Sequence, residues 1–377
     1  MNEKIYDILI VGGGIGGLTA AIALGKHGHR LTVAEKDPTW SVYGVGIIQQ
    51  ANVVRAMAQL GIIEDYVDAG FGFDQVDVYL PSGARAARIP VPRLVEGYPA
   101  NLGIGRRALH EVLGRRAQQA GAAIRLGIEV DRLDGRGGAR EDGVDVTFSD
   151  GSTARFDIVI GADGLYSKTR SQLFPDAPGP EFTGQAVWRY NFPRPADIEC
   201  IQAYDGKVGV GLVPLSDTLM YMFVTTPEPG NPRYPLDGLA AAMRAKLVDA
   251  APGIRSLAET IVDDAEVVYK PLEWLFLEGD WHKGRTVLLG DAVHATTPHL
   301  GQGAGMAIED ALVLAEEIAR HDTPQAAFTA YHRRREDRCR YIVERSLALC
   351  RGQLGQGPLL QNAVEMGAMF DVVSQPI

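Results

Sequence analysis

The chain has 377 residues, of which 46% are hydrophobic and 22% are charged, a composition typical of a folded globular protein. Its length exceeds what one ordinary core holds, so we expect two domains. The net charge of −10 argues against nucleic acid or an anionic membrane as the main partner. The 3 cysteines form no CxxC pair and indicate neither a disulfide framework nor a metal site, so we expect no metal.

The first elements are a strand at Asp7–Val11, a glycine turn, a helix and a second strand at Leu31–Glu35. The uncharged run from Ile8 to Gly25 is close to the length of a membrane span. However, the glycines at 12–14 would break a helix in its middle, so we expect no membrane span. The N-terminus lacks the pattern of a signal peptide, which predicts a cytoplasmic protein.

The glycine turn fits the GxGxxG spacing, with a strand before it and a helix after it. Gly12 permits the tight turn, Gly14 lets the backbone approach a pyrophosphate, and Gly17 lets the helix pack closely on the sheet. Glu35 ends the second strand, where an acid accepts hydrogen bonds from a ribose. These features predict an adenine dinucleotide, and Glu35 in place of an arginine favours FAD or NAD over NADP.

The next segment holds a glycine loop at Gly44–Ile48, which is either a structural turn or backbone packed against a flat ring. Alternating residues from Phe71 to Pro92 predict a hairpin. A helix is expected from Arg106 to Gln119. Arginine in the first turn of a helix is unfavourable for the helix dipole, which indicates either an anionic partner or a solvated side chain.

Strands are expected at Ala122–Val130, Val144–Phe148 and Phe156–Ile160. The last of these ends in Asp163-Gly164, and Ser167 and Arg170 then begin a helix. An acid and a glycine therefore follow a buried strand, at the carboxyl end where open α/β sheets bind ligands.

Strand-like runs separated by prolines replace helical periodicity between Phe182 and Thr225, which predicts an inserted antiparallel sheet. A helix at Leu236–Ala250 and a strand at Glu266–Tyr269, returning to the first domain, should follow.

The stretch from Thr286 to Ala311 predicts a buried parallel strand, a polar glycine-rich loop and a helix from Gly303 to Ile318. Asp291 at the strand end and the backbone N–H groups of the helix start suit a polar cofactor and negative charge. The later basic run, Arg333–Arg335, is interpreted as a solvated helix face rather than a binding patch. The tail suits packing or a homodimer contact.

The fold class that follows is α/β: a Rossmann-like dinucleotide-binding domain, an inserted, mostly antiparallel β-sheet, and C-terminal helices. The resemblance described below implies that the first is an FAD-binding domain and that the inserted sheet binds the substrate. The predicted boundaries are 1–75, 98–180 and 266–350 for the discontinuous FAD-binding domain, 76–97 and 181–265 for the substrate sheet, and 351–377 for the helical tail.

Three motifs stand in order: GGGIGG with Glu35, GADGLYSKTR at 161–170, and GDAVHATTPHLGQGAG at 290–305. Together they resemble the single-component FAD-dependent aromatic monooxygenases of the para-hydroxybenzoate and salicylate hydroxylase type. The resemblance implies bound FAD, with NADH or NADPH as a transient electron donor. It implies O2 and a small aromatic substrate as partners. The implied reaction hydroxylates an aromatic or N-heteroaromatic ring through a flavin C4a-hydroperoxide.

The resemblance also implies roles for particular residues. The pyrophosphate and ribose would be held at the N-terminal turn, the phosphates by an arginine, and the flavin by the later turns. The implied cofactor-binding residues are Gly12, Gly14, Ile15, Gly16, Gly17, Glu35, Lys36, Val45, Gly46, Arg106, Asp163, Gly164, Gly290, Asp291, Pro298, Gly301, Gln302, Gly303 and Ala304. Many members carry an asparagine after GQG, where this chain has Ala304, so side-chain contacts there are not carried over.

His299 is the candidate catalytic base, because its loop precedes the flavin-facing turn, whereas His294 is expected to be structural. Arg189, Tyr204, Tyr221 and Pro298 are the candidate substrate-binding residues, with Arg189 suited to a carboxylate. Two alternatives stay open: oxygenation of a polycyclic or polyketide natural product, and a non-catalytic binding protein with a flavin fold.

Overall fold

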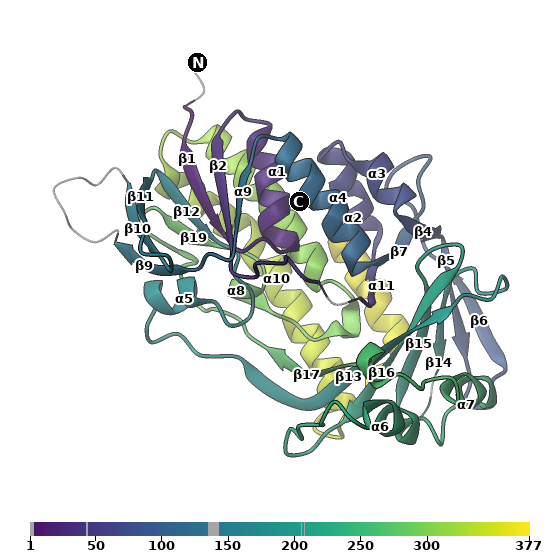
Figure 1. Cartoon of the computed structure of the whole chain (residues 1–377). Helices are drawn as coiled ribbons and strands as arrows, with labels where there is room; N and C mark the ends of the chain where they lie inside the picture. The colour runs from purple at the N-terminus through teal and green to yellow at the C-terminus, as the bar shows by residue number, and fades with distance from the viewer. Residues whose placement is uncertain (1–3, 43, 135–142, 205, 207) are drawn as a thin grey trace.

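The computed structural model describes residues 4–42, 44–134, 143–204, 206 and 208–377 (Figure 1). It contains a six-stranded sheet with the order β18-β19-β12-β1-β2-β8 and a seven-stranded sheet with the order β17-β13-β16-β15-β14-β5-β6. Two three-stranded sheets, β11-β10-β9 and β3-β7-β4, complete the β-structure of this part of the chain. The fold class expected from the sequence is confirmed.

The six-stranded sheet is parallel except for its edge strand β18. Its strands are β1 (Asp7–Val11), β2 (Arg30–Glu35), β8 (Ala123–Leu126), β12 (Ile158–Gly161), β18 (His282–Lys283) and β19 (Thr286–Leu288). Ile8 and Ile10 of β1 face a core shared with the helices, and Leu9 and Val11 face a second core. A strand that is buried on both faces must be apolar throughout, which explains the run DILIV.

The second core belongs to the small antiparallel sheet, which covers one face of the parallel sheet (Figure 1). Its strands are β9 (Val130–Asp134), β10 (Val144–Phe148) and β11 (Thr153–Phe156). Helices cover the other face: α1 (Ile15–Gly25), α4 (Arg106–Gln119), α9 (Gly303–Arg320) and α10 (Pro324–Gln353). The part of the molecule built on the parallel sheet is therefore three layers thick, and its glycine turns emerge at the carboxyl ends of the parallel strands.

The seven-stranded sheet is antiparallel except for the pairing of β5 with β14. Its strands are β5 (Gln75–Tyr79), β6 (Arg85–Pro90), β13 (Glu181–Pro193), β14 (Ile201–Tyr204), β15 (Gly209–Pro214), β16 (Leu219–Pro227) and β17 (Val268–Trp274). Its outer face packs on α6 (Leu239–Lys246) and α7 (Pro252–Ala258). Its other face packs on the small sheet of β3 (Gly46–Gln49), β4 (Gly70–Phe73) and β7 (Asn101–Gly105).

The remaining elements join these parts. Helix α10 extends from the parallel sheet to β13, where Gln353 accepts a hydrogen bond from Gln185 at 3.0 Å (Figure 1). The shorter elements are α2 (Ala51–Gln59), α3 (Ile63–Asp68), α5 (Lys168–Leu173), α8 (Asp291–His294), α11 (Asn362–Val373) and the 3-10 turns η1 (Asp264–Glu266) and η2 (Pro298–Leu300). Within the described ranges, no helix is long and apolar enough to cross a membrane.

Three expectations about elements were wrong. The helix expected at Leu236–Ala250 is shorter, since α6 ends at Lys246, and Pro252 begins a second helix beyond the expected range. The strand expected to return to the first domain is β17, which pairs with β13 at the edge of the seven-stranded sheet. The expected strand at 122–130 is interrupted by Gly127, which has a φ of 70°.

The basic run was also misread. Arg333 is exposed, but Arg335 is fully buried and forms ion pairs with Glu309 and Asp310. The cause lies in helical spacing: Phe328, Tyr331 and Cys339, which are buried, share one face of α10 with Arg335. A count of charges along the run does not take this periodicity into account.

Candidate functional site

A cavity of about 440 Å³ lies between the carboxyl ends of the parallel strands and the seven-stranded sheet. The predicted site residues that line it are Gly14, Ile15, Gly16, Gly46, Arg106, Gly164, Arg189, Tyr221, Gly290, Asp291, Pro298, Gly301, Gly303 and Ala304. These residues come from distant parts of the sequence and from both large sheets. The other predicted residues lie behind the cavity wall or away from it.

The glycine turn after β1 has the geometry that its three glycines predict. Gly12 has a φ of 105°, and a Cβ there would lie 2.4 Å from the carbonyl oxygen of Ala162. A Cβ on Gly17 would lie 2.0 Å from the carbonyl oxygen of Gly12, so α1 approaches the turn too closely for any side chain. A Cβ on Gly14, in contrast, would meet nothing within 4 Å, which leaves open space for a ligand beside the backbone.

Three side chains fix Gly13 at the centre of this turn. Glu35 accepts a hydrogen bond from the Gly13 N–H at 2.8 Å and another from the Asp37 N–H. The Gly13 carbonyl oxygen accepts a hydrogen bond from Trp40 Nε1 at 2.9 Å, and His110 Nε2 lies at the same distance from it. The indole and the imidazole meet edge to face, with ring centroids 4.7 Å apart. Trp40 and His110 were missed because neither belongs to the fingerprint.

In the Asp163-Gly164 turn, the side chain and the backbone have different roles. The Asp163 carboxylate accepts hydrogen bonds from Ser167 Oγ at 2.5 Å and from the Thr169 N–H at 2.9 Å. It therefore stabilises the start of α5, and Gly164 provides the backbone that lines the cavity. Arg170 donates to the Ala292 carbonyl oxygen, which links this turn to the next one.

The turn after β19 brings a carboxylate to the cavity. Gly290 has a φ of 62°, and Asp291, which follows it, begins the short helix α8. The Asp291 side chain is exposed to the cavity, and desolvation by the surrounding protein raises the pKa of its carboxyl group. The attraction of His294 and of Arg106 opposes this rise in the pKa, and Arg106 lines the same cavity.

Gln302 is placed differently from the glycines on either side of it. Its side chain is buried and points away from the cavity, toward Gln50 and Asn52. The adjacent Gly301 and Gly303 line the cavity, and α9 begins at Gly303. The loop therefore offers backbone groups and a helix N-terminus to a ligand, whereas the glutamine amide holds the loop in place.

His299 does not line the cavity. Its Nδ1 lies 2.9 Å from Thr297 Oγ1, and its Nε2 lies 3.1 Å from Gln353 Oε1 at the end of α10. Burial lowers the pKa of His299 to about 4, so the ring is neutral near pH 7. His294 is fully buried, and its Nε2 lies 2.7 Å from Asp310 Oδ2, which agrees with the structural role expected for it.

Arg189 and Tyr221 stand together on the wall formed by the seven-stranded sheet. Burial and the repulsion of Arg106 lower the pKa of Arg189 to about 10. In the parts of the chain that the structure describes, no carboxylate forms an ion pair with Arg189. Burial raises the pKa of Tyr221, and its ring packs where a Cβ on Gly46 would come within 2.4 Å. Two arginines and a phenol therefore face one cavity.

Tyr204, the other tyrosine proposed for the substrate, lies elsewhere. It stacks on Tyr79 with ring centroids 4.6 Å apart, donates to Gln202, and does not line the cavity. The side chains of a strand alternate between the faces of a sheet, and sequence alone does not tell which face meets the cofactor. Phe223, Lys270 and Glu273 line the cavity and were missed, although period-two spacing places Phe223 on the same face as Tyr221.

A glycine-rich turn at a helix start, with an acid ending the next strand, defines a dinucleotide-binding fold. The second large sheet forms the other wall of the cavity, an arrangement typical of flavoproteins that bind a cofactor and a substrate side by side. Comparisons with known proteins agree. Residues 5–346 match the family described as FAD binding domain. The 6-hydroxynicotinate 3-monooxygenase of Bordetella bronchiseptica is 32% identical, with 88% of each chain covered.

Two further relatives are similar over nearly the whole chain. The FAD-dependent urate hydroxylase of Mycolicibacterium vanbaalenii is 30% identical over 91% of this chain and 87% of that protein. The crystal structure of Klebsiella pneumoniae HpxO complexed with FAD and uric acid has a TM-score of 0.85 and 27% identity, and covers 98% of this chain and 97% of that one. The chain belongs to the family of FAD-dependent monooxygenases that carry this domain.

The residues present suit FAD. The open space beside Gly14 leaves room for a pyrophosphate, and the close backbone contacts at Gly12 and Gly17 keep the turn in the shape that provides this space. Gly301, Gly303 and Ala304 present backbone to the cavity, and Gly46 lines its opposite side. Arg106 and Asp291 line the same cavity, where the guanidinium would suit an anionic cofactor and the carboxylate would suit sugar hydroxyls.

Proposed function

We propose that the protein hydroxylates a small aromatic or N-heteroaromatic ring that carries an anionic group, using O2 and NADH or NADPH. The observation that carries the proposal is Arg189, a cation on the substrate-sheet wall that forms no ion pair with a carboxylate of the described residues. Burying a charge without a partner is costly, so a ligand that brings the opposite charge would bind favourably there. The named activities of the relatives on urate and 6-hydroxynicotinate support a ring of this kind.

When bound, reduced FAD supplies the reaction with electrons for O2, and one oxygen atom is transferred to the ring. The protein has to hold the ring against the flavin, exclude water and stabilise negative charge. Arg189 would bind the anionic group of the substrate, and Pro298 and Tyr221 would enclose its ring. The N-terminus of α9 at Gly303 would stabilise negative charge on the pyrimidine edge of the flavin.

The titratable side chains that line the cavity are candidates for the catalytic base. Its titratable side chains include Tyr221 and Asp291, whose pKa values are raised by burial, and a tyrosine or a carboxylate of this kind can exchange a proton with a phenolic substrate. His299 stays the base proposed from the sequence. Because its ring lies behind the wall, that role requires η2 to rotate and to break the bond with Gln353.

The experiment is a panel of substituted phenols and hydroxypyridines, each with and without a carboxylate, added to the FAD-loaded protein with NADH or NADPH. We expect the acidic members to stimulate flavin reduction and to be hydroxylated. Their uncharged counterparts, matched in ring and substituents, serve as controls. Protein that binds FAD but oxidises NADH and NADPH equally with and without every panel member would contradict the proposal.

A further inference from the structure

Two adjacent carboxylates on α9, Glu309 and Asp310, lie directly behind the two turns that face the flavin end of the cavity. Both side chains are buried, with 1% and 0% exposure. Neither lines the cavity, so neither touches a ligand there. They contact the side of each turn that faces away from the cavity.

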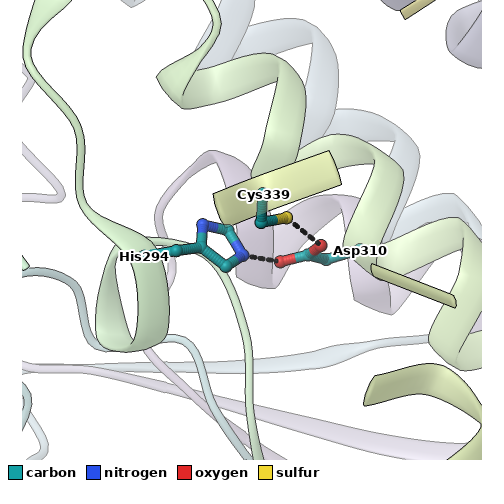
Figure 2. Close-up of side chains that lie close together, drawn as sticks. All are labelled: His294, Asp310 and Cys339. Carbon is teal, nitrogen blue, oxygen red and sulfur yellow. Dashed lines mark hydrogen bonds and ion pairs between the residues drawn. The ribbon is translucent and has the colours of Figure 1, made fainter. Parts of the chain in front are cut away.

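Asp310 holds the first turn. Its Oδ2 accepts hydrogen bonds from the Gly290 N–H at 2.9 Å and from His294 Nε2 at 2.7 Å (Figure 2). Gly290 has a positive φ and immediately precedes Asp291, so these contacts fix both ends of the segment that aims the Asp291 carboxylate at the cavity. A shift of Asp310 would therefore move Asp291.

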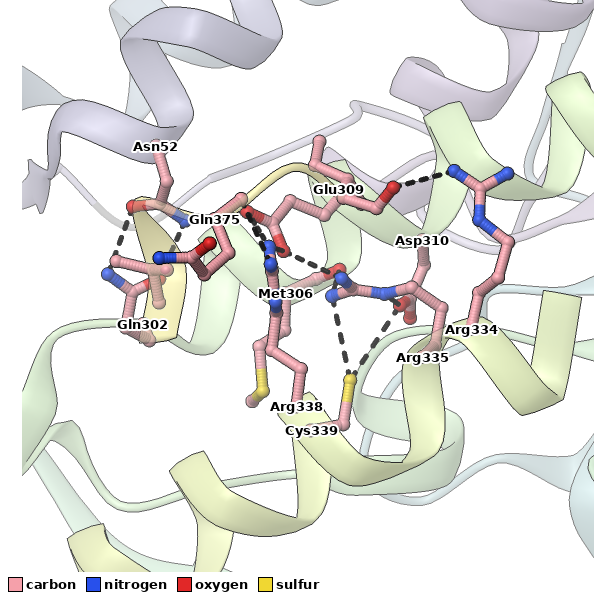
Figure 3. A network of polar contacts seen from close by, with 12 residues as sticks. Asn52, Gln302, Met306, Glu309, Asp310, Arg334, Arg335, Arg338, Cys339 and Gln375 are labelled. Carbon is pink, nitrogen blue, oxygen red and sulfur yellow. Dashed lines mark hydrogen bonds and ion pairs between the residues drawn. The ribbon is translucent and has the colours of Figure 1, made fainter. Parts of the chain in front are cut away.

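Glu309 holds the second turn through Asn52. Its Oε1 accepts from Asn52 Nδ2 at 2.9 Å, and Asn52 Oδ1 in turn accepts from Gln302 Nε2 at 3.1 Å (Figure 3). Gln302 Nε2 also donates to Gln50 Oε1 at 2.6 Å. The chain of contacts thus runs from Glu309 to the residue between the two glycines that face the flavin.

Arg335 joins the two arms. Its Nε donates to Asp310 Oδ1 at 2.8 Å, and its Nη1 donates to Glu309 Oε2 at 2.7 Å (Figure 3). The guanidinium is fully buried on α10, and its fork geometry suits two carboxylates at once. It also lies against Asp310 and Cys339 (Figure 3), which form a group with His294 (Figure 2), and its positive charge and its bond to Asp310 oppose a metal ion there.

We infer that Arg335, Glu309 and Asp310 form a positioning unit for FAD, which sets the Gly290–Asp291 turn and the Gly301–Gly303 turn relative to each other. The inference rests on the proposed assignment of these turns to the flavin end of the cofactor. A buried ion pair is often no more stabilising than apolar residues of similar volume, so stability alone does not account for three buried charges here. The position of these three charges behind both turns accounts for them.

The test compares Glu309→Gln and Asp310→Asn with the wild-type protein in titrations of apoprotein with FAD, well below the unfolding temperature. Each variant keeps the shape of the side chain but turns an amide donor toward donors that the carboxylate had accepted from. We expect the Kd for FAD to rise about tenfold or more, and the visible absorption bands of the bound flavin to shift.

A matched control lies in the seven-stranded sheet. Glu228 is 2% exposed, accepts hydrogen bonds from Thr226 and Tyr234, pairs with Lys246 at 2.7 Å, and does not line the cavity. Glu228→Gln should lower stability comparably and leave the Kd for FAD and the flavin spectrum unchanged. Gln302→Leu, which spares the three charges and removes only the far end of one arm, should again raise the Kd.

The inference is overturned if the three test variants bind FAD with wild-type affinity and spectrum, or if Glu228→Gln weakens FAD as much as they do. Either result would reduce the unit to ordinary core structure. The proposed function fails differently: wild-type protein would bind FAD tightly, the test variants weakly, and none of them would hydroxylate an acidic ring.

Discussion

Arg189 and Arg335 are both largely shielded from solvent, but they differ in their charged partners. Arg335 has no exposed surface and bonds to two carboxylates. Arg189 lines a cavity wall, where burial and the repulsion of another cation, Arg106, lower its pKa. A buried charge with matched counter-charges stabilises structure, whereas a charge left without one is available to a ligand. The comparison separates the scaffold of the site from its binding surface.

The largest effect is expected from Arg335→Met, which removes the buried cation that bonds to both Glu309 and Asp310. Arg338 then remains beside Glu309, and His294 remains beside Asp310. Removing one partner of a buried ion pair costs about 3–5 kcal/mol, and we expect the free energy of unfolding to fall by that amount. Denaturant titration measures it. Arg333→Met, two residues away on the exposed face, is the control and should change stability by less than about 0.5 kcal/mol. Equal losses of stability in the two variants would contradict the structural role of Arg335.

Arg189→Ala should affect substrate binding and not stability. Because Arg189 is repelled by Arg106 and is without a carboxylate among the described residues, its removal should leave stability unchanged or slightly higher. The KM for acidic ring substrates should rise roughly ten- to hundredfold, since a charge-assisted hydrogen bond is lost. Arg189→Lys should fall between, because lysine keeps the charge but not the fork. An equal change in KM for charged and uncharged rings would contradict the role.

The pH dependence of stability gives a third comparison. The pKa of His299 is lowered from 6.5 to about 4 in the folded protein, so between these values the unfolded chain binds more protons. The stability contribution of neutral His299 is therefore present above pH 6.5 and is lost as pH falls toward 4. His299→Gln should flatten this part of the stability profile.

The same variant tests the catalytic role of His299. If His299 is the base, the acidic limb of the kcat/KM profile should disappear in His299→Gln. If the limb stays unchanged while the stability profile flattens, His299 belongs with Arg335 to the scaffold.

Trp40→Phe should have the smallest effect. It removes one hydrogen bond to the Gly13 carbonyl oxygen, and His110 Nε2 remains beside that oxygen. A single neutral hydrogen bond contributes about 1 kcal/mol, so the Kd for FAD should rise several-fold. Fluorescence titration of the apoprotein with FAD measures it, and Trp274→Phe, distant from this turn in the sequence, is the control. An unchanged Kd would mean that His110 and Glu35 suffice.

Much of the fold was predictable because its signals are local. The apolar run at Asp7–Val11, the glycines after it and the strand and turn at Val287–Asp291 each carry their own pattern. The cofactor class followed from the order of these motifs. Sequence periods do not reveal which face of an inserted sheet meets the cofactor, so Tyr221 was placed well and Tyr204 was not.

The buried network was not predictable for a related reason. Arg335, Glu309 and Asn52 lie far apart in the chain, and their pairing depends on how α2, α9 and α10 pack. In the sequence, Arg335 is one arginine in a basic run, and such runs usually belong to a solvated surface. Its spacing from Tyr331 and Cys339 was the available signal, because all three lie on one face of a helix.

The central claim is that this cavity transfers an oxygen atom from O2 to an acidic ring held by Arg189. Its most direct test is turnover of an acidic panel member under isotopically labelled O2, with mass spectrometry of the product. The account predicts one labelled oxygen atom in the product of the wild-type protein and a much smaller yield with Arg189→Ala. A product labelled from water instead, or equal yields from the two proteins, would contradict it.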